Sequence, residues 1–400
     1  MGRLNKRAFL ARLQRLGLAS RADLAKSLGL SQPTAGKIAD ELLALGVLEE
    51  AEEPALPLHE LGSGGGSGPM QLGRPGRMLR LNRSRPRFVA IQLGVNETKL
   101  AAVPVGAEPE DHWAAEVRTL NSAEAWLGQM RSAAEEIPLR GAWGVMVSVP
   151  GVVDEQAGRV LFSPNLHWTE KVDLTKLVQQ VWRAPCLLVQ EERALALGHQ
   201  HVEPDSEDFF LVDFGEGVGG AVIVAGRLYA NPLPLSGEFG HSPVLGNARP
   251  CGCGATGCVE TLVSTRGLLQ SFGAARGRAA SGWTALMEAI KAEGLQPWLV
   301  EALDAAAVVI AGALNVLGLR RVVVTGSLTE MPPVVLDYLS KAIIQGSMWA
   351  RFGEVTVQAA PRRRIAGLVA VGLDRLVLPM TEAKRGPKTT QRLSTRHSMI

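Results

Sequence analysis

The pattern of apolar and polar positions divides the chain into a short helical front and a longer body of strands and helices. Phe9, Leu13 and Leu16 recur at the spacing of one helix face, which predicts a helix over residues 5–17. In the body, apolar runs such as FVAIQLGV alternate with helical patterns, which predicts a mixed α/β fold. Similar strand-and-hairpin openings at residues 88 and 209 predict two related halves with a ligand between them.

Two short helices in the front carry the start and stop signals of a helix-turn-helix. Ser20 is a candidate N-cap for a helix that ends near Leu28. Ser31 caps a second helix, with Pro33 in its first turn and Gly46 after its last residue. Two helices joined by a tight glycine-containing turn are typical of DNA-binding domains.

The start of the second helix and the segments after it supply candidate DNA contacts. Polar side chains in the first turns of a recognition helix face base edges and phosphates. Here they are Ser31, Gln32, Thr34 and Lys37. VLEE and RMLRLN predict the two strands of a wing, whose Arg74 and Arg77 would reach phosphates or a minor groove. A small helical dimerisation module without DNA contact is the alternative.

Charge separates the same regions. Residues 1–87 carry 14 Lys and Arg against 8 Asp and Glu, residues 88–380 carry 23 against 30, and residues 381–400 carry 5 against 1. A basic front on an acidic body favours contact with a polyanion, although a solvated face has the same composition.

Two stretches of the sequence bear on whether the protein enters or crosses a membrane. The apolar stretch 302–318 contains Asp304 and Asn315, so we expect a buried helix and no membrane partner. The N-terminal stretch has no apolar signal-peptide core, and we expect a cytoplasmic protein.

Three of the four cysteines lie within CGCGATGC, which begins at residue 251. Four cysteines in 400 residues do not make a disulfide scaffold. His241 precedes them in GEFGH, and three thiolates with one imidazole are a ligand set of structural zinc. A redox pair would explain neither His241 nor Cys258. The sequence thus predicts a structural Zn²⁺ held by His241, Cys251, Cys253 and Cys258.

GEFGH followed by CGCGATGCVE resembles the signature of the ROK family, which groups repressors, open reading frames and sugar kinases. SVPGVVD, SPNLHW and GEGVGGAVIVAGRLY resemble further stretches of that family. The front is similar to its transcriptional-repressor branch, which includes xylose and N-acetylglucosamine repressors. The resemblance covers residues 5–378 and implies an actin-like ATPase (ribonuclease H-like) fold for the body.

Pattern and resemblance together predict four segments. They are a winged helix-turn-helix (1–82), a first α/β lobe (83–205), a second α/β lobe with the zinc site (206–380) and a disordered basic tail (381–400).

The resemblance also implies effector contacts. The family's sugar-binding residues match Asn165, Glu238, His241 and Glu260, and Glu191 keeps a carboxylate at a further such position. Amides and carboxylates suit this role because they form directional hydrogen bonds to hydroxyls. Without the resemblance, Asn165 reads as a turn residue and Glu260 as a helix N-terminal charge. An imidazole has two nitrogens, so His241 is able to serve metal and sugar together.

Two stretches depart from the family's kinases. D-x-G-G-T is replaced by QLGVNETK, in which Gln92 takes the aspartate's place, Val95 blocks close backbone approach and Glu97 adds a negative charge. QEER stands in place of N-D-x-N, and Glu191 extends the catalytic carboxylate by one methylene. We therefore expect no kinase activity.

These features predict a sugar-responsive DNA-binding regulator, most simply a repressor, that binds a sugar or sugar derivative without phosphorylating it. Its expected partners are palindromic double-stranded DNA, the sugar effector and further copies of itself in a dimer or larger homo-oligomer. The alternatives are an ATP-dependent sugar kinase that retains a DNA-binding domain, and a DNA-binding protein whose body only dimerises.

Overall fold

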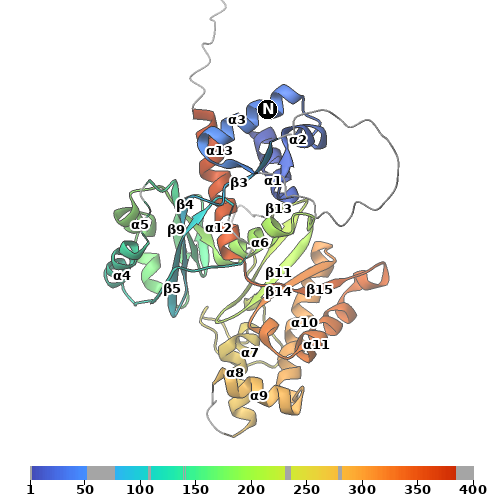
Figure 1. The fold of residues 1–400 in the computed structure, drawn as a ribbon. Helices are drawn as coiled ribbons and strands as arrows, with labels where there is room; N and C mark the ends of the chain where they lie inside the picture. Colours follow the sequence, from blue (N-terminus) through green and yellow to red (C-terminus); the bar gives the residue numbers. More distant parts are fainter. Residues whose placement is uncertain are drawn as a thin grey trace, which may run out of the picture. The chain divides into compact units, whose positions relative to one another are not determined.

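The computed structural model describes residues 2–51, 77–106, 110–137, 139, 141–229, 236–277 and 282–383 (Figure 1). The chain divides into two compact units. One groups Met1–Leu81 with Leu373–Ile400, and the other comprises Asn82–Gly372. The two lobes expected from the sequence therefore belong to one unit.

The N-terminal segment folds as helices around a small antiparallel sheet. Its helices are α1 (Gly2–Leu16), α2 (Arg21–Ser27) and α3 (Gln32–Leu45), and its strands are β1 (Ala19–Ser20), β2 (Leu48–Ala51) and β3 (Met78–Leu81). The strands pair in the order β1-β3-β2. Phe9, Leu24 and Leu79 are fully buried and form the centre of this unit.

The expected boundaries of α2 and α3 are confirmed, whereas the helix predicted over 5–17 begins earlier, at Gly2, and ends at Leu16. The Ser20 hydroxyl accepts from the Asp23 amide at the start of α2, and the Asp23 carboxylate accepts from Ser20 in return. Ser31 caps α3, and Gly46 ends it in the left-handed conformation at φ 73°. Local capping chemistry thus sets these boundaries.

The C-terminal helical region is not one continuous α-helix. The structure has α12 (Arg364–Gly372), then a π-helical turn, η6 (Leu373–Val377), and then α13 (Leu378–Ala383). Residues from Leu373 onward group with the N-terminal segment, where α13 packs on α1 and Arg7 pairs with Asp374. The boundary at 380 is therefore misplaced, and 381–383 are helical; 384–400 lie outside the described residues.

Two five-stranded sheets with equivalent strand orders build the larger unit. The first contains β4 (Pro86–Leu93), β5 (Glu97–Pro104), β6 (Ala115–Arg118), β7 (Gly144–Val149) and β10 (Cys186–Gln190). The second contains β11 (Phe209–Phe214), β12 (Val218–Val224), β13 (Arg227–Leu228), β14 (Arg321–Gly326) and β15 (Thr356–Ala359).

Their orders are β6-β5-β4-β7-β10 and β13-β12-β11-β14-β15. In each, the central strand pairs antiparallel with the next strand of the chain and parallel with a later one. The expected two related halves are confirmed. A short hairpin, β8 (Val152–Asp154) and β9 (Arg159–Phe162), adds to the first half.

Each half has its own core, covered by its own helices. Trp126 packs in the first core with Val89 and Val147, and Phe210 packs in the second with Ile310. The helices of the first half are α4 (Ala123–Glu136), η2 (His167–Lys171) and α5 (Leu174–Trp182). Those of the second are η3 (Phe239–His241), α7 (Glu260–Val263), α8 (Thr265–Ala275), α9 (Trp283–Glu293), α10 (Pro297–Leu317), η4 (Ser327–Glu330), α11 (Pro333–Gly346) and η5 (Met348–Arg351).

Helices α6 (Glu191–Val202) and α12 lie between the two sheets and cross at two glycines (Figure 1). A Cβ on Gly198 would lie 1.8 Å from the carbonyl oxygen of Arg363, and one on Gly367 would lie 1.8 Å from that of Ala194. Only glycine permits this approach. α12 packs on α6, β4 and β7, so it lies with the first half although its sequence position assigned it to the second lobe.

Within the described residues, α10 is the one helix that is long and apolar enough to cross a membrane by length and composition. Its Leu303, Ala307 and Ile310 are buried in the second core. Core helices of soluble proteins pass the same test, so α10 by itself is weak evidence for a membrane span.

Candidate functional site

One cavity of about 390 Å³ is lined by residues from both halves of the larger unit. It gathers segments that are far apart in the sequence, including the end of β4, the start of α6, the β11–β12 hairpin and the segment before α12. All five predicted effector residues line it: Asn165, Glu191, Glu238, His241 and Glu260. The structure therefore brings this set together.

Glu238 is held at the cavity wall by two neighbours. Its Oε1 accepts a hydrogen bond of 2.9 Å from Gln190 Nε2, and its Oε2 lies 3.6 Å from His241 Nε2. Burial raises the pKa of Glu238, and the opposing effects of His241 and Gln190 are smaller. Gln190 is the first residue of QEER, and its contact with Glu238 was not predicted from the sequence.

Glu260 lines the cavity and also accepts a hydrogen bond from the backbone. Its Oε2 accepts a hydrogen bond of 2.9 Å from the amide of Val218, at the start of β12. It is also the first residue of the four-residue helix α7, as the reading without the resemblance expected. One carboxylate thus fixes the glycine hairpin beside the cavity.

His241, Cys251, Cys253 and Cys258 place their ligand atoms within 4.8 Å of one another. The distance from His241 Nδ1 to Cys251 Sγ is 3.5 Å, and that between the sulfurs of Cys253 and Cys258 is 3.7 Å. A tetrahedral ion with zinc-like bond lengths requires about 3.6 Å and about 3.8 Å, respectively. A disulfide needs about 2.05 Å, and all four cysteines of the chain are free thiols. The cluster is able to hold a metal.

The cysteine loop needs glycine for its geometry. Gly254 and Gly257 have φ of 92° and 86°, and a Cβ on Gly257 would lie 2.6 Å from the Asn247 carbonyl oxygen. Burial raises the pKa of the Cys251 thiol to about 12, and a bound cation would reverse this because it favours thiolate.

The two nitrogens of His241 face different partners. Nδ1 faces the Cys251 sulfur, whereas Nε2 faces Glu238 on the cavity side. One nitrogen of His241 is therefore available to a metal and the other to a group in the cavity, in agreement with the expectation from the sequence.

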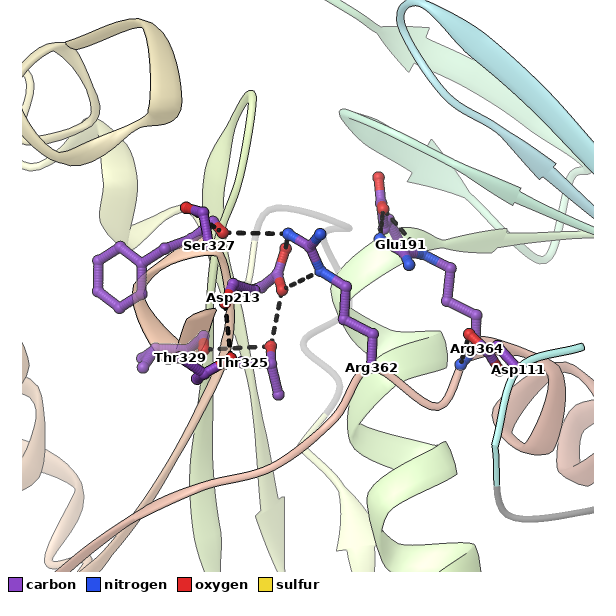
Figure 2. Close-up of polar contacts among 11 residues, drawn as sticks. Asp111, Glu191, Asp213, Thr325, Ser327, Thr329, Arg362 and Arg364 are labelled. Carbon is purple, nitrogen blue, oxygen red and sulfur yellow. Dashed lines mark hydrogen bonds and ion pairs between the residues drawn. The ribbon is translucent and has the colours of Figure 1, made fainter. Parts of the chain in front are cut away.

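QLGVNETK and QEER line the same cavity, and two arginines bind carboxylates there (Figure 2). Arg364 Nε donates to Glu191 Oε1 at 2.9 Å, and its Nη2 contacts the same oxygen. Arg362 binds the two oxygens of Asp213 through Nε and Nη2, and Asp213 also accepts from Thr325 Oγ1 at 2.7 Å. Sequence reasoning missed Asp213, Arg362 and Arg364; the run of three arginines before an apolar helix was the available signal.

Comparison with known proteins decides the family. The model of the ROK family matches residues 88–369, which is most of the chain. The chain belongs to the ROK family.

The relatives of this ROK protein include both repressors and kinases. The xylose repressor of Caldicellulosiruptor bescii is 26% identical over 282 residues, which cover 66% of this chain and 65% of the repressor. The N-acetylmannosamine kinase of Shigella boydii serotype 18 is 30% identical over 183 residues, which cover 45% of this chain and 63% of the kinase. The chain thus spans less than two thirds of these curated relatives.

A solved ROK family transcriptional regulator, described as a homolog of the E. coli MLC protein, has a similar fold. Its TM-score is 0.72 at 20% identity, over 96% of this chain and 99% of the other. At that identity the likeness establishes the fold alone. The larger unit of this ROK protein therefore has the family's actin-like, sugar-kinase-type mixed α/β fold.

The predicted DNA-contact residues are accessible where the structure describes them. Ser31, Gln32, Thr34 and Lys37 are exposed at the start of α3. Arg77 is exposed and pairs with Glu50 at 2.7 Å, while Arg74 lies outside the described residues.

Proposed function

We propose that this ROK protein is a sugar-responsive, DNA-binding transcriptional repressor of the cytoplasm that does not phosphorylate its effector. Its relatives include xylose repressors, and its fold matches that of a ROK transcriptional regulator. The observation that carries the proposal is a contrast inside one cavity. Asn165, Glu238, His241 and Glu260 line it together with Glu191, but Glu191, which stands at the kinases' catalytic-base position, is bound by Arg364.

The effector contacts would be Asn165, Glu191, Glu238, His241 and Glu260. Glu238 accepts a hydrogen bond from Gln190 and lies 3.6 Å from His241, and Glu260 accepts from the Val218 amide and lies 3.8 Å from the Cys251 sulfur. A carboxylate has about four lone-pair sites, so hydrogen-bonding capacity remains for sugar hydroxyls. Glu191 would contribute through the oxygen that Arg364 does not bind. Such a set selects among epimers, because a misplaced hydroxyl leaves a buried polar group unpaired.

The N-terminal unit would be the DNA reader, as a winged helix-turn-helix. α3 would enter the major groove with Ser31, Gln32, Thr34 and Lys37, and the wing would add Arg77 and Arg74. A homodimer would match a palindromic operator, because each copy reads one half-site. Effector binding would alter the relative placement of the two readers and so release or strengthen the complex.

The cluster of His241, Cys251, Cys253 and Cys258 would hold Zn²⁺. The sulfur and nitrogen distances fit a tetrahedral ion, and four protein ligands leave no position open for a reacting water. The metal would fix the loop that carries the effector residues His241 and Glu260.

A sugar kinase that retains a DNA-binding domain is the second candidate, because N-acetylmannosamine kinases are among the relatives. Glu191 would then have to exchange Arg364 for the substrate hydroxyl before it could act as a base. ATP-dependent phosphate transfer to any hexose or N-acetylhexosamine would favour this candidate.

A thermal-shift screen of sugars, followed by DNA binding, tests the proposal. We expect one sugar class to raise the unfolding temperature of the wild type and of the exposed-site control Glu288→Ala, but not of Glu238→Ala. The same sugar should change the affinity for duplexes selected from a random-sequence pool. If no sugar changes either quantity, the body is a dimerisation scaffold and the proposed function is wrong.

A further inference from the structure

The Arg362 guanidinium lies between two glycine turns of the second half (Figure 2). A Cβ on Gly215, in the β11–β12 hairpin, would lie 2.6 Å from Arg362 Nη2. A Cβ on Gly326, at the end of β14, would lie 2.5 Å from the same atom. The missing side chains at both glycines thus make the space that the guanidinium fills.

Arg362 is fixed in this space by charge-assisted bonds. Its Nε and Nη2 donate to the two oxygens of Asp213 at 2.8 and 2.9 Å, and Nη2 also donates to the Phe214 carbonyl at 3.0 Å. Burial raises the pKa of Asp213, but the charge and hydrogen bonds of Arg362, together with Arg364 and Thr325, outweigh it, and the net pKa is lowered. The carboxylate therefore stays ionised and the two-pronged pair persists.

Glycine at these two turns leaves room for a group that approaches the backbone closely, and the guanidinium fills that room. QLGVNETK, which stands where the family's kinases organise phosphates, lines the same cavity through Gly94, Val95 and Glu97. A phosphate that enters this cavity would therefore share it with the guanidinium.

The other cations that line the cavity are also paired. Lys99 lies 2.9 Å from Glu116 and 3.6 Å from Glu97, and Arg364 holds Glu191. Glu192 and Glu216 add further carboxylates to the lining. A phosphate that enters would have to break an ion pair and would leave a carboxylate without its cation.

We propose that Arg362 permanently occupies the phosphate subsite of this cavity, so that nucleotides and phosphorylated sugars are excluded and an uncharged sugar is accepted. The sugar part of this proposal rests on the proposed function, whereas the exclusion of nucleotides does not. The specificity-determining group is thus a side chain of the protein itself.

Calorimetric titration with Mg·AMP-PNP and with pyrophosphate tests the exclusion. The wild type and Arg363→Ala should show no binding at millimolar ligand; Arg363 is a matched control because it pairs with Glu203 at 3.0 Å and does not line the cavity. The double variant Asp213→Asn, Arg362→Ala removes cation and carboxylate together, so no buried charge remains unpaired. We expect it to bind either ligand at least tenfold more tightly than the wild type.

Two outcomes would overturn the exclusion. One is submillimolar binding of Mg·AMP-PNP by the wild type, and the other is a folded double variant that gains nothing. Circular dichroism establishes folding. If the alanine variant does not fold, Asp213→Asn, Arg362→Gln also removes both charges, keeps more of the side-chain volume than alanine does, and is judged by the same criterion.

A comparison of a sugar with its phosphate ester tests this inference independently of the proposed function. Any sugar that stabilises the wild type is compared with its phosphate ester at the terminal carbon, which we expect to bind at least tenfold more weakly. Equal or tighter binding of the phosphate ester would contradict the inference and leave the repressor function intact. If no sugar binds at all, the proposed function fails, while the nucleotide titration still decides the role of Arg362.

Discussion

Two groups of charged residues in the cavity are bound in different ways. In the first, which we call the binding end, Glu238 accepts from Gln190 and Glu260 from the Val218 amide, with longer contacts to His241 and to the Cys251 sulfur. In the second, which we call the occupied end, Asp213 and Glu191 are each bound by an arginine through two nitrogens. The first group is the one proposed to bind a sugar, whereas arginines of the protein hold the carboxylates of the second.

This difference separates recognition from chemistry. A kinase needs a free base and a place for phosphate, whereas a sensor needs only a selective sugar site. The family can use one fold for both because function resides in the site and not in the architecture. Substitutions in each group of residues test whether the two groups differ in this way.

Loss of the metal should disrupt the binding end most severely. Cys253→Ser removes one of four ligands, and we expect bound zinc to fall from about one equivalent to nearly none. Thermal unfolding should shift down by several degrees or more, because metal binding contributes directly to folding stability. Elemental analysis and calorimetry measure the two effects. Cys186→Ser is the control, since Cys186 lies in β10 outside the cluster; an unchanged zinc content in Cys253→Ser would refute the metal site.

Breaking the ion pair at the occupied end should cost nearly as much. Arg362→Ala leaves Asp213, only 9% exposed, without its cation, and such losses cost about 3–5 kcal/mol of unfolding free energy. Arg363→Ala should cost about 1 kcal/mol or less, because its partner Glu203 is 42% exposed. Urea denaturation measures both. Similar losses in the two variants would show that the Arg362 pair has no special role.

The same pair predicts a dependence on pH. Because the pKa of Asp213 is lowered in the folded protein, its contribution is complete above the unfolded value of about 4. It is lost as the pH falls from there through the folded value. Wild type should therefore lose more stability than Asp213→Asn between pH 5 and pH 3. Parallel curves for the two proteins would argue against a lowered pKa.

A smaller effect is expected at the binding end. Glu238→Gln keeps the shape of the side chain but removes the charge, and hydrogen bonds to charged groups contribute about 1.5–3 kcal/mol. We expect sugar affinity to fall by roughly tenfold to a hundredfold with little change in DNA affinity without sugar. Glu288→Ala should leave both unchanged, because Glu288 is exposed on α9. Equal sugar affinity in Glu238→Gln would move the sugar site elsewhere.

The smallest effect is expected in the N-terminal unit. Lys37→Ala removes one exposed positive charge at the start of α3. DNA binding should weaken for all sequences alike, and the slope of log affinity against log salt should decrease by about 1. Lys291→Ala, on α9, should not change that slope. A sequence-dependent loss in Lys37→Ala would instead indicate direct base readout.

Local chemistry made several features predictable from the sequence. Ser20, Ser31 and Gly46 set helix ends through contacts within one turn, so the boundaries of α2 and α3 follow from neighbouring residues. The repeated strand-and-hairpin openings likewise indicated two halves, and the equivalent strand orders confirm them.

Longer-range packing was not predictable in the same way. α12 is apolar on most of its surface, so its sequence shows that it is buried but not against which sheet. The π-helical turn after it and the grouping of Leu373 onward with the N-terminal segment likewise depend on tertiary contacts.

The sequence by itself determined the family, the two related halves and the Cys3His cluster, because each rests on motifs of a few neighbouring residues. Only the tertiary structure decided that Arg362 lies on Asp213, which is 149 residues away in the chain. An ion pair over that separation depends on which segments the fold brings together, and no local pattern encodes it. Likewise, only the fold shows that Arg364 binds Glu191, 173 residues away in the chain.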